Sequence, residues 1–169
     1  DVGGTELGVD PVRRSGAIPL VHVSPNSPFG ANARPTDRFS EDSPLHPYMG
    51  YGESKVEAEA IVRRGVERGD IDAVTVRAPW FYGPRQPARQ SQWFKAVRLG
   101  RFPLVGDGTP QRAMVCTAAL VQGLLRAAAP TPPAGRAYWV AERGRSDRTH
   151  VWGTPRAGTA ARRAPVSGG

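Results

Sequence analysis

The sequence has few of the features that mark secreted or membrane-spanning proteins. Cys116 is the single cysteine among 169 residues, which excludes a disulfide framework within the chain. We therefore expect a cytoplasmic protein in a reducing compartment. No apolar run approaches the roughly 20 residues that span a bilayer, and the first residues lack the apolar core of a signal peptide, so we predict no membrane partner. The chain begins with Asp1 rather than methionine, from which we expect a fragment or a processed product.

Lysine is also scarce, although the chain is basic. Lys55 and Lys95 are the only lysines among 23 basic residues, and the formal net charge is +8. Residues 1–142 carry 17 basic and 14 acidic side chains, whereas residues 143–169 carry six arginines and one aspartate. Proteins that bind nucleic acid usually present their basic residues on a folded face. Because most of the excess charge lies in the C-terminal tail, we predict no nucleic-acid partner.

The tail, residues 143–169, differs from the rest of the chain in composition as well. It consists mainly of Arg, Gly, Ala, Pro and Thr and shows no apolar periodicity. Such a segment cannot bury enough apolar surface to offset the entropic cost of ordering it. We therefore predict one folded unit over residues 1–142, followed by a disordered tail.

Apolar runs and helical periodicity alternate along residues 1–142. Short apolar runs bounded by turn residues predict strands at 20–23, 73–76, 114–116 and 137–140. Periodic apolar residues predict helices at 5–16, 51–68, 92–99 and 118–128. The proline-rich segment 25–50 is predicted to be a long loop. A strand followed by a helix and a second strand indicates a parallel pair with a right-handed crossover, which predicts an α/β fold.

The helix predicted at 51–68 places a tyrosine and a lysine on one face. Tyr51 and Lys55 are four residues apart, so their side chains project from the same side of the helix. A free tyrosine has a pKa of about 10 and is a poor base at neutral pH, but a neighbouring ammonium favours the phenolate. Such a tyrosine moves a proton to or from a substrate hydroxyl. The alternative is a surface tyrosine beside a solvated lysine, because chance gives this spacing in roughly one such sequence in twenty.

Two further features concern the same helix. Glu59 and Arg63 are spaced for an ion pair on its outer side, and Gly69 is placed to end it.

Several motifs surround the Tyr51–Lys55 pair in a fixed order. They are Val21-His22-Val23-Ser24, Phe29-Gly30, Tyr51-Gly52-Glu53-Ser54-Lys55, Arg77-Ala78-Pro79-Trp80-Phe81-Tyr82-Gly83-Pro84, Gly106-Asp107-Gly108 and Arg112. Their order and spacing over residues 1 to about 142 resemble the extended short-chain dehydrogenase/reductase family of NAD-dependent epimerases and dehydratases. The resemblance implies the C-terminal part of a Rossmann-like, doubly wound parallel sheet, with a small α/β substrate-binding portion from about residue 85. Residues 1–142 would then form a partial NAD(P)-binding domain.

The resemblance also implies roles for individual residues. Tyr51 would be the general acid/base, and Lys55 would hold the ribose of NAD or NADP and favour the phenolate. Ala78 and Pro79 would lie beside the nicotinamide, where a loop leaves the carboxyl end of a strand. Arg112 would grip the diphosphate of a nucleotide-sugar substrate, with a solvated turn arginine as the alternative. A homodimer is compatible with the same resemblance.

Two departures from the family pattern concern the reaction. In the family that this chain resembles, a catalytic Ser or Thr stands at the position of Pro25, and proline has no hydroxyl group. Ser24 and Ser27 are candidates to replace that hydroxyl, but neither is in register with the family's motif. Losing one positioned donor costs roughly 10²–10³ in rate. The nucleotide-sugar dehydratases of the family that this chain resembles carry an Asp-Glu pair just after the catalytic Thr. This chain has Asn26 and Ser27 at those positions, and the resemblance implies that Asn26 faces the substrate. We therefore expect epimerisation or alcohol/ketone oxidoreduction rather than dehydration.

A third departure concerns cofactor binding. The sequence has no G-x-x-G-x-x-G following a strand, the motif that places a pyrophosphate on a helix N-terminus. Three hypotheses therefore stay open. The chain is an epimerase or oxidoreductase impaired by truncation and Pro25, a non-catalytic relative that binds a nucleotide or a partner, or a fragment without a stable fold.

Overall fold

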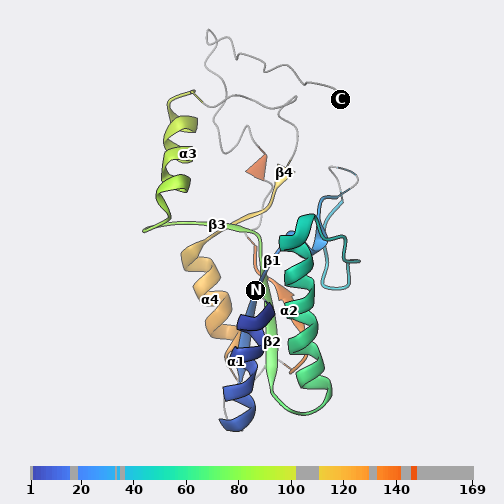
Figure 1. The fold of residues 1–169 in the computed structure, drawn as a ribbon. Coiled ribbons are helices and arrows are strands. Elements are labelled where there is room, and N and C mark those ends of the chain that lie inside the picture. The colour runs from blue at the N-terminus through green and yellow to red at the C-terminus, as the bar shows by residue number, and fades with distance from the viewer. Residues whose placement is uncertain are drawn as a thin grey trace.

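The computed structural model describes residues 2–15, 19–32, 34, 37–101, 111–129, 133–141 and 146–147. Helices and strands alternate along most of this length (Figure 1). The helices are α1 (Val2–Ser15), the short 3-10 helix η1 (Ser27–Phe29), α2 (Met49–Glu67), α3 (Ala88–Arg98) and α4 (Thr117–Ala127). The strands are β1 (Leu20–Pro25), β2 (Ala73–Ala78), β3 (Trp80–Tyr82), β4 (Gln111–Arg112), β5 (Met114–Cys116), β6 (Ala137–Trp139) and β7 (Ser146–Asp147).

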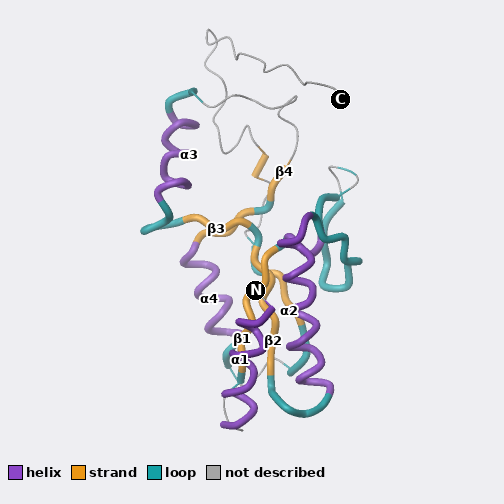
Figure 2. The backbone as a smooth tube through the Cα atoms, viewed as in Figure 1, coloured by secondary structure: helices purple, strands orange, loops and turns teal. Residues whose placement is uncertain are grey.

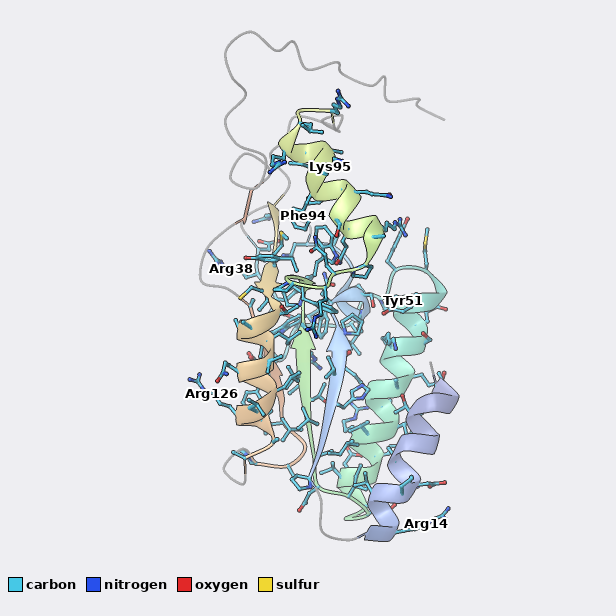
Figure 3. The ribbon with its side chains drawn as sticks, turned by 90° about the vertical axis from the view of Figure 1, so that its left-hand side faces the viewer. Arg14, Arg38, Tyr51, Phe94, Lys95 and Arg126 are labelled. Atoms are coloured by element: carbon cyan, nitrogen blue, oxygen red, sulfur yellow. The ribbon has the colours of Figure 1, made fainter. Side chains whose placement is uncertain are left out.

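A parallel sheet lies at the centre of the described chain. Its strand order is β1-β2-β6, and β1 pairs with β2 in the register Leu20↔Ala73 to Pro25↔Ala78. Helix α2 connects β1 to β2, as a parallel pair requires. Helices α1 and α2 cover one face of the sheet and α4 covers the other (Figures 2 and 3). This three-layer arrangement confirms the predicted α/β fold class.

The two faces of the sheet bury separate apolar clusters. The cluster on the α4 side contains Val74, Val76, Ala78, Val115, Leu120 and Ala127. The cluster on the side of α1 and α2 contains Val62, Ile71 and Ala73, with partly buried residues of α1 packed against it. Successive residues of a strand point to opposite faces, so β2 contributes to both clusters. This explains why its sequence reads as a nearly continuous apolar run.

Helix α2 begins two residues before the predicted start, at Met49, and ends at Glu67 as predicted within one residue. Gly69 adopts φ +72°, which suits the glycine expected to end the helix. The predicted Glu59–Arg63 ion pair is wrong. Arg63 instead pairs with Glu67 at 3.6 Å on the exposed side, and Glu59 pairs with Arg77. The error arose because Glu59 lies on the side of α2 that faces the sheet, where β2 supplies a nearer cation.

Several elements were not predicted. Segment 25–50 contains η1 and the start of α2 besides loop. Strand β3 pairs in parallel with β5, and β4 pairs antiparallel with β7. Strand β7 lies in the predicted disordered tail; the rest of that tail, and the turn expected at 106–108, lie outside the described residues. No helix in the described part of the chain is both long and apolar enough to cross a membrane.

Candidate functional site

The N-terminal end of α2 lies at the carboxyl ends of β1 and β2, with Tyr51 in its first turns (Figure 3). In parallel α/β sheets this edge is where ligands bind. The Lys55 ammonium nitrogen lies 5.5 Å from the centroid of the Tyr51 ring. Tyr51 is 61% exposed. The Ser54 hydroxyl donates a hydrogen bond to the Tyr51 carbonyl at 2.9 Å, within the same turn.

Two glycines allow η1 to pack closely against the loop before α2 and the first turn of α2. A Cβ at Gly52 would lie 2.9 Å from the Ser27 carbonyl oxygen and 3.2 Å from Pro47. Gly30 adopts φ +67°, and a Cβ there would collide with the His46 carbonyl oxygen. The Tyr51-Gly52 and Phe29-Gly30 motifs are thus explained by backbone approach.

Hydroxyl and amide groups gather where β1 ends. Ser24 is fully buried (0% exposed), and neither its hydroxyl nor that of Ser27 has a hydrogen-bond partner among the described residues. Pro25 ends β1 opposite Ala78. Asn26 follows as the half-buried residue that precedes η1, and its side chain makes no capping bond. The structure therefore brings Ser24, Pro25 and Asn26 to the strand edge near which α2 begins.

The remaining predicted site residues are placed differently. Ala78 and Pro79 are buried at the carboxyl end of β2, and Ala78 belongs to the cluster on the α4 side. Arg112 lies in β4, where its backbone pairs with Ser146. The Arg112 side chain lies outside the described residues, so its predicted contact with a substrate diphosphate stays a prediction.

A polar layer between β1, β2 and α2 was not predicted from the sequence. Strand alternation places His22, Ser24 and Arg77 on the face toward α2, and Arg77 is the registered neighbour of Ser24. The Arg77 guanidinium donates to both Glu59 carboxylate oxygens, at 2.9 and 3.3 Å. Alternation within the two predicted strands could have identified this layer.

His22 is a titratable group of this layer whose protonation the structure perturbs. Its Nε2 atom is buried and has no hydrogen-bond partner among the described residues. Burial lowers the pKa of His22 from its ordinary value of 6.5; Glu59 opposes the shift and Lys55 adds to it. The imidazole is therefore neutral at neutral pH.

The residues present fit one end of a nicotinamide dinucleotide. Tyr51 and Lys55 offer a hydroxyl and an ammonium at the ligand-binding edge of the sheet, which suits a ribose. The Ser24 hydroxyl, buried near the end of β1, has no hydrogen-bond partner among the described residues. The sequence supplies no glycine-rich turn for a pyrophosphate. Among the described residues, the fit is therefore to the ribose at this edge of the sheet.

Comparison with known proteins places this arrangement in a family. The family model for the NAD dependent epimerase/dehydratase family matches residues 2–141. The chain therefore belongs to this family. Protein y4nL of Sinorhizobium fredii is 44% identical over 140 residues, which are 82% of this chain and 39% of that protein. A 4-hydroxy-2-methyl-3-oxo-4-farnesyl-3,4-dihydroquinoline-1-oxide ketoreductase of Stigmatella aurantiaca is 30% identical over 84% of this chain and 42% of its own length.

Solved structures show the same fold. The dTDP-glucose 4,6-dehydratase of Bacillus anthracis, in complex with NAD, has a TM-score of 0.76 at 23% identity over 86% of this chain and 47% of its own. The UDP-glucuronic acid 4-epimerase of Bacillus cereus, also with NAD, has a TM-score of 0.74 at 20% identity over 86% and 48%. RMD of Pseudomonas aeruginosa is complexed with NADPH. The chain thus spans about half the length of the relatives it matches or less.

Proposed function

We propose that the protein is an NAD- or NADP-dependent epimerase or oxidoreductase that acts on a nucleotide sugar or a similar hydroxyl or keto compound. The observation that carries the proposal is the Lys55 ammonium 5.5 Å from the Tyr51 ring, at the carboxyl-end edge of a parallel sheet. Family membership over residues 2–141 supports the reaction class. Because the chain spans about half of its relatives' length, activity and substrate are proposals for the whole protein.

In the proposed reaction, the Tyr51 phenolic oxygen takes the proton of a substrate hydroxyl or returns it to a ketone. The Lys55 ammonium, one helical turn away, donates hydrogen bonds to the ribose. A bound nicotinamide supplies the hydride acceptor or donor for the same carbon. Ala78 and Pro79, buried at the end of β2, provide an apolar surface beside the ring. Ser24 is assigned the role of hydroxyl donor that Pro25 cannot fill.

The residues after β1 narrow the proposed reaction. Elimination of water needs an acid and a base beside the sugar, and Asn26 and Ser27 supply neither a carboxylate nor an imidazole. Epimerisation or simple oxidoreduction needs the proton shuttle of Tyr51 and the hydride exchange of a nicotinamide, without a further acid and base beside the sugar. If the Arg112 guanidinium reaches the substrate, it would bind a diphosphate through its planar pair of donors.

Pro25, which has no hydroxyl to offer a substrate, favours a second candidate, a relative that binds a nucleotide or a partner without turnover. The Ser24 hydroxyl is fully buried, so Ser24 reaches a substrate only if the end of β1 shifts. Binding and turnover therefore have to be measured separately.

Titration with NADH and with NADPH, followed by nicotinamide fluorescence, tests the first candidate. Saturable binding, followed by a change in nicotinamide absorbance on adding a UDP- or dTDP-sugar, is the expected result. Saturable binding without turnover across such sugars would favour the second candidate. Absence of binding together with a non-cooperative thermal melt would overturn both.

A further inference from the structure

Arg77 joins four segments of the chain at the end of the sheet. It projects from β2, its guanidinium carries the two bonds to Glu59 of α2, and its Nη1 donates to the Glu41 carbonyl at 2.7 Å. The guanidinium carbon also lies 4.6 Å from the centroid of the Phe29 ring, in η1. The side chains of Arg77 and Glu59 are each only 11% exposed.

The loop that Arg77 holds, residues 37–47, is also attached to the end of β6. The Trp139 backbone N–H donates to the Glu41 carboxylate at 3.3 Å, and the Trp139 indole N–H donates to the Ser40 carbonyl at 3.0 Å. Phe39 and Phe29 pack with the Trp139 ring, at centroid distances of 6.1 and 5.0 Å. The loop is therefore held over the carboxyl ends of β2 and β6.

This loop leads directly into the helix that carries the tyrosine. The His46 N–H donates to the Pro28 carbonyl at 3.0 Å, and α2 begins at Met49, which adopts φ +60°. Tyr51, Lys55 and Glu59 follow at intervals of four residues and so form one column along α2. Arg77 contacts this column at Glu59. Through the Glu41 carbonyl it also contacts the loop that leads into the helix. Arg77 is therefore connected to Tyr51 by two routes, along α2 from Glu59 and along the loop from Glu41.

We propose that Arg77 is a positioning residue: it sets the orientation of Tyr51 and Lys55 relative to the end of β1 through its joint contacts with Glu59 and the Glu41 carbonyl. This proposal rests on the proposed function for its effect on turnover. A lysine at position 77 keeps the charge, but it lacks the planar fork needed to serve the carboxylate, the carbonyl and the Phe29 ring together. A small displacement of reacting groups lowers turnover by up to about 10²-fold while leaving binding in place.

The test uses Arg77→Lys and Glu59→Gln, with Arg63→Lys as the matched control. Arg63 also lies in an Arg–Glu pair of α2, but its side chain and that of Glu67 are 66% and 63% exposed. The whole chain is labelled with 3-fluorotyrosine, and the resonance lost in Tyr51→Phe identifies Tyr51 among the four tyrosines. We expect Arg77→Lys and Glu59→Gln to shift the Tyr51 fluorine resonance, and Arg63→Lys to leave it unchanged.

The turnover rate of the same variants is measured and divided by the concentration of NAD(P)H-binding sites. The expected result is a fall of at least about tenfold in kcat for Arg77→Lys and Glu59→Gln, with NAD(P)H affinity within about threefold of the parent. An unmoved Tyr51 resonance in both variants would overturn the proposal. So would loss of the cooperative melt in both, since Arg77 would then act on stability alone. The parent protein itself could show no turnover while the Tyr51 resonance still shifts in the two variants. That result would support the positioning role of Arg77 and contradict the proposed function.

Discussion

The Lys55 ammonium nitrogen lies 5.5 Å from the centroid of the Tyr51 ring, one helical turn along α2. This places a cation beside an exposed phenol at the edge of the sheet where ligands of parallel α/β proteins bind. The same contact would be of little consequence on a helix whose N-terminal end lay away from this edge of the sheet. Its position at the carboxyl ends of β1 and β2 makes the hydroxyl group a candidate for chemistry.

Replacing Tyr51 with phenylalanine should reduce turnover by about 10²-fold or more, because it removes the proton-transferring oxygen and keeps the ring. NAD(P)H affinity should stay within a few fold. Tyr48→Phe is the matched control, since Tyr48 is 69% exposed near the same end of α2. Steady-state rates of the two variants are compared with the parent. Equal rates in all three would end the assignment of Tyr51 as general acid/base.

Restoring the missing hydroxyl by Pro25→Ser should raise turnover, by up to about 10²-fold if the new group reaches the substrate oxygen. Pro25 lies at the last position of β1, so the exchange leaves the strand pairing opposite Ala78 in place. Ser24→Ala is measured in parallel. A fall in turnover for Ser24→Ala with no gain for Pro25→Ser would show that Ser24 already fills the role.

Lowering the pH should destabilise the fold through His22. Because burial lowers the His22 pKa in the folded state, the unfolded chain binds more protons between that lowered value and 6.5. The stability from the neutral imidazole is thus fully present above pH 6.5 and is lost as the pH falls through this window. Urea unfolding at several pH values should show this decrease in the free energy of unfolding.

The His22→Val variant isolates the contribution of that imidazole. Between pH 6.5 and the folded-state pKa of His22, the free energy of unfolding should fall less in this variant than in the parent. The reason is that the substitution removes the titrating group from the buried layer. His46→Val is the control, since His46 is exposed. An identical pH dependence in the parent and in His22→Val would contradict the assignment.

Gly52→Ala should destabilise the protein by about 1–3 kcal/mol, since the added methyl group meets the Ser27 carbonyl oxygen 2.9 Å away. Gly50→Ala is the matched control in the same helix, because a Cβ there has nothing within 4 Å. The control should be neutral or stabilising by up to about 1 kcal/mol, from the higher helix propensity of alanine. Urea midpoints and slopes of both variants provide the comparison.

The sequence was informative wherever the signal is local. Periodicity located the helix of Tyr51 and Lys55, and apolar runs located β1, β2, β5 and β6, because backbone hydrogen bonding imposes those repeats on neighbouring residues. Strand β3 was missed because Trp80–Tyr82 is short and lies between Pro79 and Gly83-Pro84, which are typical of loops. Its strand character depends on pairing with β5, more than 30 residues away in the chain.

The chain itself determined the family, the α/β class and the tyrosine–lysine spacing, because these depend on residue types at short intervals. Tertiary structure decided the partner of Glu59. By spacing alone Arg63 is a suitable cation, but folding turns Glu59 toward Arg77, 18 residues away in sequence. Folding also decided that Ser24 is buried and that residues 37–47 are held at the sheet edge. Contacts of this kind form between segments far apart in the chain, and no local repeat records them.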